Sequence, residues 1–158
     1  MSDIQYVPPE GSENPFLTPE ETVRAYAAAW STSFDEHEES LKHLYTWNHI
    51  AFTDTREMLN DEMTDELRPF FTAFPDQNLH VEEVITEGNK SFVRYTVTLT
   101  MTGPLMGIPP TGKTAVVPIL EISIHRDGRF HHSWSRTDTL SQMEQQGLLG
   151  DDGKSFWY

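Results

Sequence analysis

The hydrophobic pattern of this chain changes its period once, near Pro75 and Asp76, and that change restricts the possible folds. Before it, apolar residues recur at the spacing of one helix face; after it, they alternate as in β-strands. The first helix is predicted to begin at Thr18, with Pro19 in the first turn and Glu21 completing a capping box. The residues of this helix that we expect to be buried are Val23, Tyr26, Ala27 and Trp30.

Two more helices are predicted over residues 35–45 and 61–74, with a short strand over 49–52 between them. Four strand-like runs follow, over residues 79–86, 91–101, 114–126 and 129–139. Residues 87–90 and the pair Asp127-Gly128 are typical of tight hairpin turns. We therefore expect an α+β fold in which a four-stranded antiparallel meander curves against the helices. Residues 18–149 would form one domain, with a flexible leader over 1–17 and a tail over 150–158.

Composition excludes several classes of function. The formal net charge of -14 and the pI near 4.7 argue against binding to nucleic acid or to anionic membranes, because both need basic surface. The absence of cysteine excludes disulfides, thiolate metal sites and cysteine nucleophiles. No basic segment followed by an apolar run marks a signal peptide, so we expect a cytoplasmic protein.

The segment from Gly107 to Thr114 fits the literal pattern of a phosphate-binding loop, G-x-x-x-x-G-K-[ST]. Such a loop binds phosphates through successive backbone N–H groups and then opens a helix. Pro109 and Pro110 remove two of those donors, and the β-branched run after Lys113 predicts a strand. The sequence therefore argues against nucleotide binding.

Several segments carry a likeness to a known family. They are Ala73-Phe74-Pro75-Asp76, Val84-Ile85-Thr86-Glu87-Gly88-Asn89-Lys90, Val93-Arg94-Tyr95, Gly107-Ile108-Pro109-Pro110-Thr111-Gly112-Lys113, Asp127-Gly128-Arg129 leading to Trp134 and Asp138, and Gln145-Gln146-Gly147. Over about residues 73–149 the chain resembles the SnoaL-like polyketide cyclases and ester cyclases of the NTF2-like superfamily. The resemblance implies a cone of curved sheet closed by helices around a pocket, a homodimer or higher oligomer, and no cofactor. It also implies aldol-type ring closure of a polyketide-derived substrate, with Asp138 as general acid/base.

Two positions depart from the family pattern. Met101 stands where many members carry a histidine between two threonines, and His131 or His132 stands where an acidic residue is common. The pocket chemistry can therefore differ from aldol ring closure. Relatives with this fold also isomerise, dehydrate or open epoxides, so the fold alone does not choose among these reactions.

The last predicted strand carries the main candidates. Alternation places Phe130, His132, Trp134, Arg136 and, if no bulge intervenes, Asp138 on one face. Asp138 would be the acid/base, Trp134 an apolar wall that raises its pKa, and His132 a second proton carrier. Alternatively, Arg136 and Asp138 form a structural ion pair that keeps the carboxylate charged.

Other polar and aromatic residues are candidates for binding the substrate. Arg94 would bind a carboxylate or enolate oxygen, or pair with Glu121 across the sheet. Glu121 and His125 share a strand face on which a structural role is favoured. The remaining candidates for the pocket wall or mouth are Tyr26, Trp30, Trp47, Asn48, His49 and Phe52. No histidine and carboxylate spacing suits a metal, and no serine stands in a nucleophile elbow.

These observations favour a cofactor-independent cyclase or isomerase acting on a medium-sized, largely apolar carbonyl compound in natural-product biosynthesis. Two alternatives stay open. The same acid could open an epoxide or drive a dehydration, or the fold could serve as a non-catalytic ligand-binding or dimerisation module.

Overall fold

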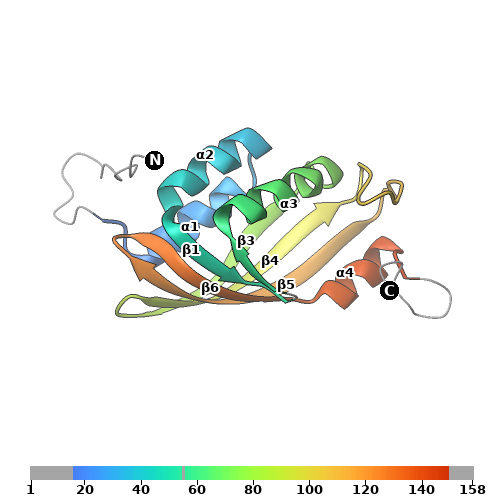
Figure 1. Ribbon diagram of the computed structural model, residues 1–158. Helices are drawn as coiled ribbons and strands as arrows, with labels where there is room; N and C mark the ends of the chain where they lie inside the picture. The colour runs from blue at the N-terminus through green and yellow to red at the C-terminus, as the bar shows by residue number, and fades with distance from the viewer. Residues whose placement is uncertain (1–15, 55, 150–158) are drawn as a thin grey trace.

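The computed structural model describes residues 16–54 and 56–149, so the predicted leader and tail lie outside it except for Phe16 and Leu17. Within this part the elements run α1 (Pro19–Ala29), α2 (Phe34–Leu44), β1 (Tyr45–Phe52), β2 (Glu57–Leu59), α3 (Asn60–Ala73), β3 (Asn78–Glu87), β4 (Lys90–Thr100), β5 (Thr114–Arg126), β6 (Arg129–Thr137) and α4 (Thr139–Gln146). The α+β order, helices before the meander, is confirmed. Figure 1 shows α1, α2 and α3 over one face of the curved sheet, with α4 at one end of it.

Capping boxes fix where the first two helices begin. Thr18 accepts a hydrogen bond from the N–H of Glu21, whose carboxylate accepts one from the N–H of Thr18, as predicted. Ser33 and Glu36 form the same reciprocal pair at the start of α2. α2 ends one residue before the predicted boundary, because Tyr45 takes an extended conformation and begins β1 directly.

The sheet has six strands in the order β2-β1-β6-β5-β4-β3. Strands β3 to β6 form the predicted antiparallel meander. β1 adds to β6 in parallel, and the short β2 pairs with β1 at the edge. Parallel strands need a long crossover, so no local turn pattern in the sequence indicates this pairing.

The β5–β6 hairpin contains both a tight turn and a bulge. Asp127 and Gly128 have φ angles of 50° and 71°, as a two-residue turn with a positive φ at both central positions requires. Ile124 pairs with His132 and His125 pairs with Phe130, so His131 is an extra residue in β6. From this bulge onward, every β6 side chain lies on the face opposite to that expected from simple alternation.

The loop after β4 is tied to the end of α3. The N–H groups of Thr102 and Gly103 both donate to the carbonyl of Ala73, at 3.0 and 3.1 Å. A Cβ atom on Gly103 would collide with the backbone carbonyl of Thr72, so only glycine permits this approach. The loop ends at Thr114, which begins β5; the strand predicted after the apparent phosphate loop is confirmed. No helix in the described residues is both long and apolar enough to cross a bilayer.

Candidate active site

A cavity of about 490 Å³ lies between the concave face of the sheet and the helices. Its walls are mainly apolar, with side chains from α1, α3, β4 and the loop after β4. Examples of these apolar residues are Trp30, Leu67, Phe70, Val97, Leu99 and Leu105. Pockets for small organic molecules typically enclose about 300–1,000 Å³ and are lined in this way.

Glu121 of β5 is a carboxyl group within this lining and is only 7% exposed. Its Oε1 accepts hydrogen bonds from Ser123 Oγ at 3.0 Å and from the Tyr95 hydroxyl at 3.4 Å. Burial raises the pKa of Glu121 to about 7, although both hydrogen bonds act in the opposite direction. Near neutral pH this group therefore exists in both protonation states.

Three tyrosines surround Glu121. Tyr26, Tyr45 and Tyr95 line the cavity, and each is at most 9% exposed. Burial is the main cause that raises the pKa of each phenol above its ordinary value, and the nearby Glu121 carboxylate adds to each shift. The three hydroxyls are therefore protonated. That of Tyr95 donates to Glu121, whereas those of Tyr26 and Tyr45 can donate hydrogen bonds into the cavity.

His49 of β1 is buried beside these groups and connects two polar side chains. Its Nε2 lies 2.9 Å from Ser133 Oγ and its Nδ1 lies 3.2 Å from Asn60 Oδ1. Burial lowers the pKa of His49 to about 4, so the imidazole is neutral at pH 7. The ring also stacks on Tyr45, with the two centroids 4.0 Å apart.

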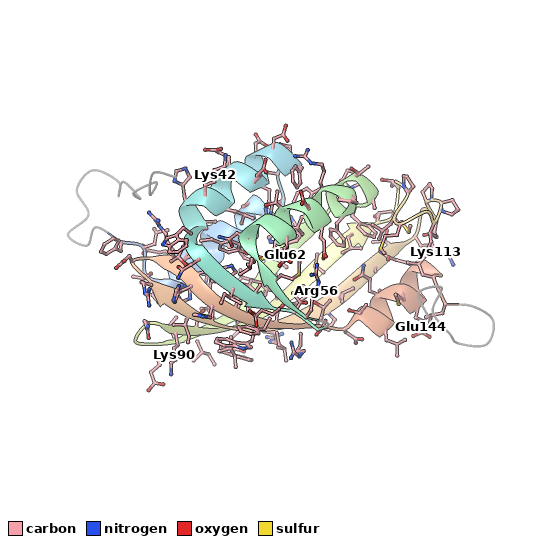
Figure 2. All side chains as sticks on the ribbon, viewed as in Figure 1. Lys42, Arg56, Glu62, Lys90, Lys113 and Glu144 are labelled. Atoms are coloured by element: carbon pink, nitrogen blue, oxygen red, sulfur yellow. The ribbon has the colours of Figure 1, made fainter. Side chains whose placement is uncertain are left out.

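Two further carboxylates of the lining, Asp54 and Glu66, are each ion-paired. Asp54 Oδ1 lies 3.8 Å from Arg136 Nε, and Glu66 contacts Arg56. Arg56 also lies 3.7 Å from Glu62, where β2 meets α3 (Figure 2). Among the described residues, no arginine or lysine belongs to the cavity lining.

The structure corrects the placement of Asp138, which we expected inside an apolar pocket. Asp138 is exposed, and its Oδ1 accepts from the N–H of Ser141 at 3.1 Å as the N-cap of α4. Its neighbours Thr137 and Thr139 line the cavity, but Asp138 does not. Arg136 pairs with Asp54 and not, as the alternative held, with Asp138.

The bulge at His131 is the physical reason that the predicted face of β6 was wrong. Past the bulge, Ser133, Ser135 and Thr137 line the cavity, whereas His132, Trp134 and Arg136 lie on the outer face. Trp134 is 37% exposed and stacks on Phe52, with the ring centroids 5.1 Å apart. Neither Trp134 nor His132 is part of the lining.

The other substrate-binding candidates divide between the two faces of the sheet. Tyr26, Trp30, His49 and Glu121 line the cavity as expected, whereas Trp47 is 81% exposed and Asn48 is not part of the lining. Arg94 does not pair with Glu121, because Arg94 is opposite Leu120 and lies on the outer face. There it lies 3.7 Å from Glu83. His125 shares the inner face with Glu121 but binds Ser91 outside the cavity lining.

Sequence reasoning missed several polar residues of the site, among them Tyr45, Asn60, Tyr95 and Ser133. Tyr95 alternates with the apolar residues Val93 and Val97, and that alternation could have placed it on the inner face. Simple alternation assigned Ser133 to the wrong face, because it does not allow for the bulge. The contact between His49 and Ser133 joins residues 84 positions apart, which no local pattern reveals.

Solved structures confirm the fold. The chain is similar to AclR from Streptomyces galilaeus, with a TM-score of 0.73 and 23% identity over 84% of this chain and 82% of that one. It is similar to IdmH from Streptomyces antibioticus, with a TM-score of 0.72 and 21% identity over 82% of this chain and 99% of that one. A protein from Catenulispora acidiphila with a ketosteroid isomerase-like fold matches with a TM-score of 0.67 and 16% identity, covering 83% of this chain and 95% of that one.

These structural likenesses establish the NTF2-like cone that the resemblance implied. No protein of curated function matches the chain. The family model described as SnoaL-like polyketide cyclase matches residues 20–146, which is most of the sequence and includes every side chain of the cavity before Leu148. The chain therefore belongs to the SnoaL-like polyketide cyclase family.

Proposed function

We propose that this protein is a cofactor-independent acid/base enzyme that closes a ring by an aldol-type step, or isomerises, a polyketide-derived carbonyl compound. Family membership supports a role of the polyketide cyclase type. The observation that carries the finer proposal is Glu121, a buried carboxyl in the cavity lining with a pKa of about 7. In this role Glu121 replaces Asp138, which the sequence favoured.

The chemistry begins with removal of a proton from the carbon next to a carbonyl group. A general base works best when its pKa is near the working pH, since it must both take and return the proton. Oε1 of Glu121 is occupied by Ser123 and Tyr95, while Oε2 accepts no hydrogen bond from any described residue. Oε2 is therefore the oxygen that takes the substrate proton and returns it after the ring closes or the double bond moves.

The enolate oxygen that forms needs hydrogen-bond donors in a site of low dielectric constant. The hydroxyls of Tyr26 and Tyr45 are such donors in the same lining. Preorganised donors at a developing negative charge are commonly the largest contribution to catalysis, and losing one costs about 10²–10³-fold in rate. The tyrosines therefore stabilise the charge that Glu121 creates.

The charges of the lining favour an uncharged substrate. Its carboxyl groups are those of Asp54, Glu66 and Glu121, and neutral His49 adds no positive charge. A ligand carboxylate or phosphate would meet like charge here without a cationic partner, which is unfavourable in a buried site. A neutral, mainly apolar ketone or diketone fits both the charge and the volume.

The test is deuterium exchange at the carbon next to the carbonyl of 2-tetralone, a neutral bicyclic ketone, followed by NMR in D₂O. Glu121→Gln should lower the enzyme-dependent exchange rate by about 10²–10⁴-fold, the usual contribution of a positioned base. Asp138→Asn is the matched control and should leave the rate within about twofold, because an asparagine still caps a helix.

If Asp138→Asn lowered the exchange rate and Glu121→Gln did not, the base would be Asp138. Exchange at the uncatalysed rate in the wild type, with 2-tetralone bound, would instead indicate a ligand-binding protein. The melting temperature of each variant shows whether a lost rate reflects chemistry or unfolding.

A further inference from the structure

A second chemical group in the cavity is independent of Glu121. Ser133, His49 and Asn60 form a continuous hydrogen-bonded chain, with contacts of 2.9 Å and 3.2 Å on the two sides of the imidazole. Ser133 and His49 both line the cavity, where they are 7% and 1% exposed. The order hydroxyl, imidazole, polar orienting group is the arrangement that activates a serine nucleophile.

The protonation of this chain follows from Asn60. Its Nδ2 donates to the carbonyl of Thr46 at 3.0 Å, which leaves Oδ1 as the atom facing His49. Because Oδ1 only accepts, Nδ1 of His49 carries the proton and Nε2 is the acceptor. The Ser133 hydroxyl therefore donates to Nε2, and His49 is set to receive that proton.

A second serine–histidine pair in the same protein provides an internal comparison. Ser91 Oγ lies 2.8 Å from His125 Nε2, and both residues are buried. His125 Nδ1 has no hydrogen-bond partner among the described residues, and neither Ser91 nor His125 lines the cavity. Only the Ser133 pair therefore combines an orienting group with access to a ligand.

The geometry points to Ser133 as a nucleophile for acyl transfer, with His49 as its base and Asn60 as the residue that positions His49. The substrate class is a neutral ester, including a lactone, held in the cavity. This activity is separate from the proton transfer proposed for Glu121. The serine stands within a strand and not in a nucleophile elbow, so no sequence motif indicates this role.

These residues and one water molecule supply every group that the reaction needs. Ser133 Oγ bonds to the ester carbonyl carbon while its proton passes to His49 Nε2. The bond from that carbon to the alkoxy oxygen then breaks, and the leaving alcohol takes the proton from Nε2. Water, deprotonated by His49, next attacks the acyl-serine, which releases a carboxylic acid and restores the Ser133 hydroxyl. Tyr45, stacked on His49, supplies a hydroxyl donor in the same lining for the oxyanion.

The experiment treats the full chain with phenylmethylsulfonyl fluoride and locates the label by peptide mass spectrometry. Attack by Oγ on sulfur expels fluoride, so the expected product carries one phenylmethylsulfonyl group on Ser133 and none on Ser91. Hydrolysis of p-nitrophenyl butyrate should fall by about 10²-fold or more in Ser133→Ala and His49→Gln. Ser91→Ala, the matched control, should keep both labelling and hydrolysis.

Asn60 is tested through rescue. Asn60→Leu removes the acceptor for Nδ1–H and should lower the labelling of Ser133. Asn60→Asp keeps an acceptor and should restore that labelling. If Asn60 had only a structural role, two folded variants would be labelled equally. A wild-type chain unlabelled at Ser133, or labelled equally at Ser91, would overturn the proposal. The site of the label is determined in the wild-type chain, so the result depends neither on a variant that folds nor on the ketone exchange assay.

Discussion

The Tyr95 hydroxyl lies 3.4 Å from Oε1 of Glu121, and both side chains are buried on the inner face of neighbouring strands. Tyr95 is opposite Ile119 in β4–β5 pairing, so its hydroxyl reaches Glu121 diagonally along the strand. The hydrogen bond steadies the carboxyl but does not offset the burial that raises its pKa to about 7. A charge held at this position therefore reduces stability and supplies a proton carrier near neutral pH.

The stability of the protein should show this effect of Glu121. Its folded-state pKa of about 7 exceeds the ordinary 4.5, so the folded state binds more protons and the carboxyl lowers stability as pH rises between these values. Glu121→Gln should remove this loss, which amounts to about 3 kcal/mol by pH 8 on a scale of 1.36 kcal/mol per pKa unit. Urea unfolding of both proteins at pH 4.5 and pH 8 measures this loss as a change in the free energy of unfolding. An equal change in unfolding free energy between the two pH values in wild type and Glu121→Gln would contradict the raised pKa.

His37 should have the opposite dependence on pH. It is buried between Trp30 and Phe71, outside the cavity lining, and burial lowers its pKa to about 4 from 6.5. Its neutral form therefore contributes stability that is present above pH 6.5 and lost as pH falls to about 4. His37→Leu should lose less stability than wild type over this range, as followed by urea unfolding. A steeper loss in the variant would show that His37 is protonated in the folded state.

Asp138→Ala should reduce stability by about 1 kcal/mol, the usual value of a helix N-cap. The carboxylate accepts from the N–H of Ser141, and alanine leaves that donor without this partner. Guanidinium unfolding followed by circular dichroism measures the change. An unchanged midpoint would show that the side chain does not cap α4 in solution.

Tryptophan fluorescence should report which face of the sheet binds a ligand. Trp30 lines the cavity, whereas Trp134 lies on the outer face against Phe52. Binding of 2-tetralone should change the emission of wild type and of Trp134→Phe, while Trp30→Phe should lose most of that change. Loss of the response in Trp134→Phe instead would place the ligand on the outer face.

The sequence predicted the fold well because its signals are local. Thr18 and Glu21 cap α1 through contacts three residues apart, and Asp127-Gly128 needs only its own backbone angles. The same local reasoning did not find α4. Only Asp138 separates the end of β6 from its first turn, and the exposed Leu140 gives that short helix no clear apolar face.

The site was harder to predict, because one extra residue decides which side chains enter the cavity. His131 inserts into β6 and moves Ser133 inward and Trp134 outward. Nothing in the composition of that strand marks the bulge. Glu121 was on the correct face, but its importance depends on burial by Tyr26, Tyr45 and Tyr95, which lie far from it in the sequence.

The pH dependence of kcat/KM for deuterium exchange into 2-tetralone tests the role of Glu121 most directly. A base must be ionised to remove the proton, so the rate should rise with pH and level off, with an apparent pKa near 7 in wild type. In Glu121→Gln the enzyme-dependent rate should be low at every pH. A wild-type profile that levels off near 4.5, or one that the substitution leaves unchanged, would contradict the account.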